Sequence, residues 1–161
     1  MNVAANCPLP DANRVREMLG LLFDGFAVKP GARIDVGPKS GAHCAIYVTD
    51  DGKPAAVCAC DLAFAANSGC ALSMLPPNAA KDALKTRVLT DVMNANLREI
   101  MNICTRLLLV EGSMHLRLES VVPSDKLPAP VAGAIAASKQ RVDFELGLGK
   151  YGGGGFAAIC L

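Results

Sequence analysis

The sequence predicts a mixed α/β fold of the α+β kind, in which a mainly antiparallel sheet packs against two or three helices, one of them long. Two observations lead to this fold class. Segments of alternating apolar and polar residues are joined by short turns, which implies antiparallel pairing of neighbouring strands. Apolar residues also recur at helical spacing between about residues 79 and 109. A chain of 161 residues without repeats or linkers suits a single domain, 1–161.

The first predicted element is a helix from an Asp11 N-cap to about residue 24, because an apolar stripe follows that aspartate at helical spacing. The segment Lys29-Pro30-Gly31 breaks this pattern, and residues 33–36 are predicted as a short edge strand. A β-hairpin follows, with strands at 42–49 and 55–60 around the turn at 50–53.

The middle of the chain is predicted to be helical. An Ala-rich helix covers 62–74, and the Pro76-Pro77-Asn78 segment ends it, with Asn78 as the N-cap of the next helix. That next helix is predicted to run without interruption from about 79 to 109. The residues that form its apolar stripe are Leu84, Val88, Met93, Leu97, Ile100, Met101, Cys104 and Leu108.

Three strands are predicted near the end of the chain, at 115–122, 141–148 and 156–161. The glycines at 152–155 are predicted to form a turn between the last two strands. The sequence leaves open whether the short apolar stretch at 131–137 is helix or loop.

Composition limits the possible functions and partners. The formal net charge is +1, and no Lys/Arg cluster appears, which argues against nucleic acid as a partner. No apolar run approaches the roughly 20 residues of a membrane span, and no N-terminal targeting pattern is visible. We therefore expect a cytoplasmic protein without a membrane partner.

The chain has seven cysteines, an odd number at irregular spacing. Most lie in apolar segments, so we expect reduced core thiols. An alternative is a soft-metal or thiol site at Cys58 and Cys60, which share a strand face, together with a distant His43 or His115. The spacing of these ligands argues against that alternative.

The outer side of the predicted long helix carries a polar cluster. On a helical wheel Ala95, Glu99, Asn102 and Arg106 lie almost opposite the apolar stripe. Glu99 and Asn102 are three residues apart, so their side chains are neighbours. A carboxylate and an amide exposed on a rigid element suit binding to another molecule, although any amphipathic helix has a polar face.

The stretch Leu-Arg-Glu-Ile-Met-Asn-Ile at 97–103 resembles the Glu-x-x-Asn phosphatase motif of the CheC/CheX/FliY group. Other features resemble CheX in the same order: Val-Lys-Pro-Gly at 28–31 after the first helix, the hairpin turn, and a strand ending in Pro123. The resemblance spans about residue 12 to the end. Two features depart from it, because Ala95 stands where the family usually has Asp or Ser and the spacing from Asn102 to Pro123 is slightly shorter.

The resemblance implies a chemotaxis or two-component function: hydrolysis of the aspartyl phosphate of a CheY-type receiver domain. It implies Glu99 and Asn102 as catalytic residues, with Mg²⁺ carried by the receiver and no cofactor of this chain's own. From charge we add Arg98 and Arg106 as contacts for an acidic receiver surface. The resemblance also implies a homodimer paired through a sheet edge, for which we expect residues 33–36 and 156–161 as candidates.

A second interpretation is a degenerate family member that binds a receiver or signalling partner without hydrolysing anything. Ala95 favours this interpretation. Binding to a phosphorylated receiver without faster phosphate loss distinguishes it from the phosphatase.

Overall fold

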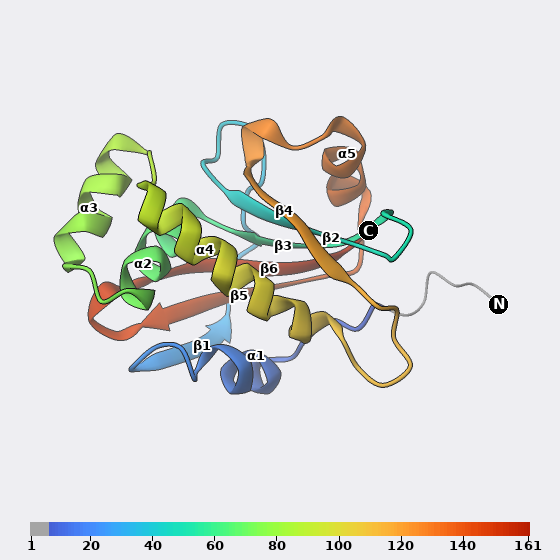
Figure 1. The fold of residues 1–161 in the computed structure, drawn as a ribbon, viewed down its shortest axis with the longest axis horizontal. Helices are drawn as coiled ribbons and strands as arrows, with labels where there is room; N and C mark the ends of the chain where they lie inside the picture. Colours follow the sequence, from blue (N-terminus) through green and yellow to red (C-terminus); the bar gives the residue numbers. More distant parts are fainter. Residues whose placement is uncertain (1–6) are drawn as a thin grey trace.

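The computed structural model describes residues 7–161, which form one six-stranded sheet with every neighbouring pair antiparallel. The strand order across the sheet is β1-β5-β6-β3-β2-β4 (Figure 1). The strands are β1 (Phe26–Pro30), β2 (His43–Val48), β3 (Pro54–Cys60), β4 (Arg117–Pro123), β5 (Arg141–Leu148) and β6 (Gly153–Cys160). The predicted α+β class is confirmed.

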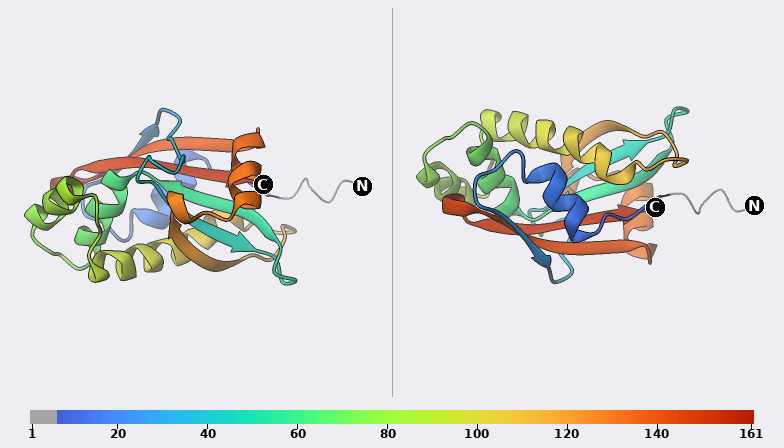
Figure 2. Two further views of the ribbon diagram at one scale, coloured as in Figure 1. Left: turned by 90° about the horizontal axis from the view of Figure 1, so that it is seen from above. Right: turned by 90° about the horizontal axis from the view of Figure 1, so that it is seen from below.

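The helices cover the two faces of the sheet unequally. The helices are α1 (Ala12–Leu19), α2 (Leu62–Leu72), α3 (Pro77–Thr86), α4 (Asp91–Ile103) and α5 (Ala129–Ala137), with 3₁₀ turns η2 (Cys104–Leu108), η3 (Ser124–Lys126) and η4 (Gly149–Tyr151). The buried side chains of α1, α2 and α4 belong to one large core, whereas α5 packs on the other face of the sheet. Figures 1 and 2 show α4 crossing the sheet and α5 at the end of the strands near the C-terminus.

Several local predictions are confirmed. Helix α1 starts where predicted, because the Asp11 side chain accepts a hydrogen bond from the Arg14 amide at 2.8 Å, but it ends at Leu19 and not near residue 24. The hairpin of β2 and β3 is present, as are strands β4 and β5 close to their expected bounds. The stretch left open at 131–137 is helical and forms most of α5.

The prediction of one uninterrupted helix from 79 to 109 is wrong. The chain breaks at Arg87, which adopts a left-handed conformation (φ 59°), and Thr90 then caps α4 through a bond from the Met93 amide at 3.2 Å. Val88, expected in the apolar stripe, is 65% exposed at this break. Asn78 is also not a cap, because α3 begins at Pro77 after Pro76.

The predicted strand at 33–36 is wrong as well. The edge strand is β1, and residues 33–36 form a loop that crosses the sheet. The Ile34 amide donates to the Asp143 carboxylate at 2.9 Å, so this loop is fixed to β5 by a side chain and not by a strand ladder.

Of the glycines at 152–155 that were expected to form a turn, only Gly152 lies in the turn (φ 83°), and the other three begin strand β6. A Cβ at Gly154 would lie 2.3 Å from the Phe64 amide nitrogen, and a Cβ at Gly155 would lie 2.5 Å from the Ile34 side chain. The glycines therefore allow α2 and the 33–36 loop to approach the strand from its two faces. Strand β6 lies between β5 and β3, so the expectation that residues 156–161 form an edge is also wrong.

The cysteines differ from expectation at two positions. Cys7 and Cys160 form a disulfide, which ties the N-terminal segment to the end of β6. The other cysteines are buried free thiols: Cys44, Cys58, Cys60, Cys70 and Cys104. Cys7 lies outside the apolar periodic segments, so nothing local to it indicated a partner at the far end of the chain.

Candidate functional site

The candidate site is the outer face of α4, and the sequence around it explains why the helix forms there. Thr90 caps the first turn, and Asp91 in that turn interacts favourably with the positive end of the helix dipole. The inner face is fully apolar, with Met93, Leu97, Ile100 and Met101 all buried.

Helix α4 packs closely on α2. Gly69 of α2 faces Met93, and a Cβ there would lie 2.9 Å from the Met93 Cβ. The Asn96 side-chain amide donates to the Gly69 carbonyl at 2.8 Å and to the Ser73 hydroxyl at 2.7 Å. Gly69, which weakens α2 as an isolated helix, is thus required for the close helix contact.

Two side chains distant in the sequence fix the C-terminal half of α4 and the turn that follows. The buried Tyr47 hydroxyl donates to the Met101 carbonyl at 2.6 Å, and burial raises the pKa of this phenol well above its ordinary value, so it stays a donor. The Arg14 guanidinium of α1 donates to the Arg106 carbonyl at 2.6 Å and also to the Leu109 carbonyl. These contacts hold the backbone on either side of Asn102.

Sequence reasoning missed these supporting residues. Arg14 is 92 residues away from its partner Arg106, and Tyr47 is 54 residues away from Met101. A periodicity analysis of each element separately contains no signal for such pairs. The unpatterned Asn96 on an otherwise apolar side of α4 was the only local sign of a contact between helices.

The structure places Glu99 and Asn102 together on the exposed side of α4, one turn apart. Within residues 7–161 neither side chain makes a hydrogen bond or an ion pair. Arg98 and Arg106, the other two residues expected at the site, are also exposed, and neither guanidinium has an acidic partner in that part of the chain. All four side chains are therefore available to a second molecule.

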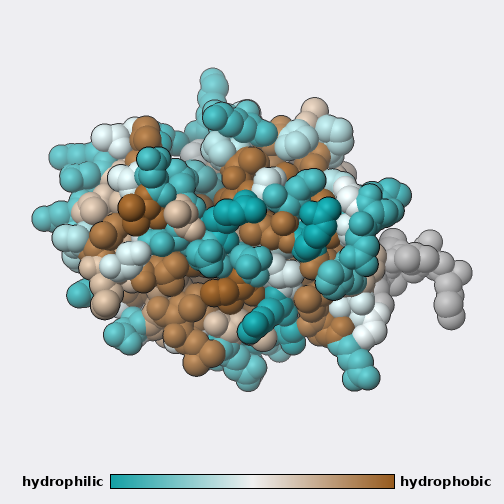
Figure 3. Space-filling model, viewed as in Figure 1, coloured by the Kyte–Doolittle hydropathy of each residue, from teal (hydrophilic) through white to brown (hydrophobic). Residues whose placement is uncertain are grey.

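The surroundings of this pair are mixed in character. Ala95 lies one turn before Glu99 and is exposed, and Val92 at 48% and Val88 at 65% exposure continue the surface towards the start of the helix. Hydrophilic and hydrophobic side chains alternate over this side of the molecule in Figure 3. The helix thus presents a polar centre with an apolar end.

The alternative thiol or metal site is not assembled. Cys58 and Cys60 lie on the inner face of β3, and burial raises the pKa of Cys58 to about 12, so its thiol is neutral. Residues 7–161 contain no group of three His, Cys, Asp or Glu side chains placed to hold a metal ion. His43 is turned towards the Gly41 carbonyl, at 3.2 Å, and burial lowers its pKa.

Comparison with known proteins depends on three-dimensional structure, since no family profile and no curated protein matches the sequence. CheX in the Borrelia burgdorferi complex with CheY, BeF₃ and Mg²⁺ superposes with a TM-score of 0.52, covering 91% of this chain and 88% of that chain at 14% identity. The chain has a CheX-like fold. The FliM middle domain of Vibrio alginolyticus shares it (TM-score 0.52, 10% identity, 92% and 86% covered), as does Thermotoga maritima FliY (0.50, 14%, 92% and 80%).

In this CheX-like fold, α4 is fixed by packing on α2, by the hydrogen bonds of Asn96 to α2 and by the hydrogen bond from Tyr47 of β2. Over residues 7–161, no helix combines the length and apolar character needed to cross a membrane.

Proposed function

We propose that the chain is a CheX-like phosphatase that promotes hydrolysis of the aspartyl phosphate of a CheY-type receiver domain. The observation that carries the proposal is the exposed Glu99 and Asn102 pair, which has no intramolecular partner within residues 7–161 and is mounted on a firmly packed helix. The solved complex of a CheX with CheY, BeF₃ and Mg²⁺ supports a receiver as the partner.

In the proposed reaction, this chain contributes position and hydrogen bonds. The Asn102 amide, which both donates and accepts hydrogen bonds, orients a water molecule in line with the phosphorus. The water oxygen forms the new P–O bond as the bond to the receiver aspartate breaks, so inorganic phosphate leaves and the aspartate carboxylate is restored. Glu99 pairs with the receiver lysine and holds the docked geometry. The receiver carries the Mg²⁺.

Arg98 and Arg106 are proposed to contact the acidic surface of the receiver. Both guanidinium groups are exposed and lie on the same helix and its 3₁₀ extension as the central pair. Their contribution would be long-range attraction, so raising the ionic strength should weaken docking before it affects the chemical step.

The decisive measurement is phosphate release from a phosphorylated receiver. Asn102→Ala should reduce the stimulated rate by about 100-fold, because the attacking water is no longer positioned. Asn94→Ala is a control on the same helix: it removes an exposed amide about 12 Å away, which donates a long hydrogen bond of 3.5 Å to the Leu89 carbonyl. It should keep the wild-type rate. Equal rates for Asn102→Ala and the wild type would contradict the assigned role.

A non-catalytic, receiver-binding role is the second candidate, and Ala95 is the observation that favours it. The exposed helix turn before Glu99 offers a methyl group where related motifs have a polar side chain. Binding of a BeF₃-activated receiver, without acceleration of phosphate loss, would support this role. In that case Glu99→Ala should weaken the complex by roughly tenfold, since one charged partner is lost.

We further propose that two copies pair through the outer edge of β4. Arg117 and Glu119 are exposed on this edge strand and make no ion pair within residues 7–161. Antiparallel pairing of two β4 strands about Leu118 places Arg117 of each copy opposite Glu119 of the other. The edge is therefore self-complementary in charge.

Sedimentation velocity tests this pairing. Arg117→Glu should weaken the dimer by about tenfold, because it sets two carboxylates opposite each other twice. The double exchange Arg117→Glu with Glu119→Arg should restore association. A chain that stays monomeric at every concentration, or a double exchange that does not recover, would exclude this edge.

A further inference from the structure

A cleft of about 670 Å³ opens on the face of the sheet opposite α4, between the loop that starts at Arg33 and helix α5. Its volume lies within the range of small-molecule sites in proteins. Its apolar walls come from the loop, from the turn before α5 and from α5 itself, and include Ile34, Val36, Leu127, Ile135 and Ala136. The start of β5 contributes Arg141. Nothing in the proposed phosphatase mechanism uses this cleft.

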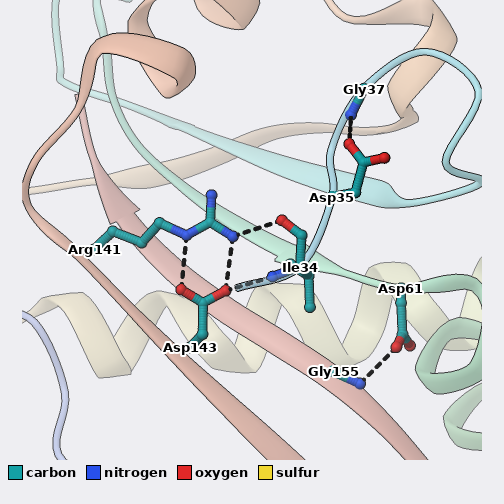
Figure 4. A network of polar contacts seen from close by, with 7 residues as sticks. All are labelled: Ile34, Asp35, Gly37, Asp61, Arg141, Asp143 and Gly155. Atoms are coloured by element: carbon teal, nitrogen blue, oxygen red, sulfur yellow. Dashed lines mark hydrogen bonds and ion pairs between the residues drawn. The ribbon is translucent and has the colours of Figure 1, made fainter. Parts of the chain in front are cut away.

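A buried arginine lines the cleft. The Arg141 side chain is only 4% exposed, and its Nε and Nη2 donate to the Asp143 carboxylate at 2.7 Å each. Nη2 also donates to the Ile34 carbonyl at 2.8 Å. Figure 4 shows the third nitrogen, Nη1, directed away from Asp143 and Ile34, and it has no hydrogen-bond partner within residues 7–161.

Small residues in the sheet leave space for this guanidinium. Across the sheet from Asp143, the paired residues are Ala157 on β6, Ala59 on β3 and Cys44 on β2. The two alanines present only methyl groups beside the Arg141 guanidinium. The positive charge of Arg141 is close enough to favour the thiolate of Cys44, although burial still raises the pKa of that thiol to about 12. The guanidinium is therefore held in place over the apolar sheet.

The unused N–H groups indicate what this cleft can bind. Arg141 Nη1 carries two N–H groups that no acceptor of residues 7–161 occupies, and they are open to the cleft. A ligand that brings an oxygen acceptor can replace water at these donors while its apolar part contacts the cleft walls. The charges in and around the cleft argue against an anion as the ligand. Two arginines are outnumbered there by three aspartates: Arg33 and Arg141 against Asp35, Asp125 and Asp143. We propose that the cleft binds a small, uncharged, mainly apolar molecule whose carbonyl oxygen accepts from Arg141 Nη1.

The fluorescent ketone 6-propionyl-2-dimethylaminonaphthalene tests this proposal, because its emission reports both apolar surroundings and hydrogen bonding to the carbonyl. The wild-type protein should bind the dye saturably. Arg141→Lys should weaken binding by about tenfold and shift the emission of the bound dye to shorter wavelength. The single ammonium nitrogen pairs with Asp143 and leaves no nitrogen at the position of Nη1 to donate to the ketone.

A matched pair of surface variants keeps the test independent of folding. Ala136 lines the cleft, whereas Ala137, the next residue of α5, is equally exposed and does not line it. Ala136→Leu should project into the cleft and weaken dye binding by about tenfold, and Ala137→Leu should leave it unchanged. Equal effects of the two variants, or the absence of saturable binding to the wild type, would overturn the proposal.

Competition decides the charge of the ligand. Octanamide and octanoate have similar apolar chains, and only the second is anionic at neutral pH. Octanamide should displace the dye at lower concentration than octanoate. Stronger displacement by octanoate would show an anion site and contradict the proposed ligand class.

Discussion

The face of the sheet beneath α4 is closed by three helices, whereas the face beneath α5 is covered by one short helix and a loop. The first face holds long apolar side chains from α2 and α4 around Tyr47. The second face is smaller, with Ile46 and Val57 of the sheet packed against Val131 and Ile135. This face also contains the buried Arg141–Asp143 ion pair and the cleft.

The two faces therefore depend on different kinds of contact. The thickly covered face produces a rigid platform, because α4 is held by apolar packing, by Asn96 and by Tyr47. The thinly covered face depends on a few polar contacts to hold its loop, and the Arg141–Asp143 pair is the centre of that network. Substitutions on the two faces should therefore have different kinds of cost.

A large effect is expected on the thinly covered face, at Asp143. Asp143→Ala leaves the buried Arg141 without its counter-charge and releases the Ile34 amide, so the free energy of unfolding should fall by about 3–5 kcal/mol. Urea denaturation followed by circular dichroism measures this loss.

Glu145→Ala is the control for this experiment. Glu145 lies on the same strand and the same face, but its pair with Lys29 is 58% and 69% exposed with a separation of 3.6 Å. Removing an exposed pair should change the free energy of unfolding by no more than about 0.5 kcal/mol. Similar losses for the two variants would show that Arg141–Asp143 behaves like a surface pair and would remove the distinction drawn between the faces.

Elements with a strong local pattern could be predicted from the sequence. The Asp11 cap, the hairpin turn at 50–53 and the alternation in β5 are all decided within a few residues, and the structure contains each of them. The exposure of Glu99 and Asn102 followed from helical geometry in the same way, because α4 is amphipathic around them. Their catalytic roles stay a prediction.

Features decided by contacts distant in sequence could not be predicted. The helical spacing of apolar residues continues across Arg87, so it gives no sign that the helix ends there. Val88 fits this spacing although its side chain is exposed. The glycines of β6 looked like a turn because a sequence does not show that Ile34 and Phe64 approach them closely. The central position of β6 follows from pairing with β3 and β5, which no local signal reveals.

The same substitution on each face, Ile100→Ala on α4 and Ile135→Ala on α5, compares how tightly the two faces of the sheet are packed. Both side chains are buried, at 0% and 2% exposure. Removing Ile100 opens a closed cavity among fully packed neighbours, so both the lost burial and the cavity contribute to its cost, about 3–5 kcal/mol. Ile135 borders the cleft, so its removal widens a space that already exists.

The loss for Ile135→Ala should therefore be about 1–2 kcal/mol smaller than for Ile100→Ala. Urea denaturation of the two variants gives the difference directly, provided that both keep the wild-type dependence on denaturant concentration. Equal losses would mean that the α5 face packs as tightly as the α4 face. Ile135 would then have no open space beside it in the folded protein, and the second face would not offer a ligand the proposed cleft.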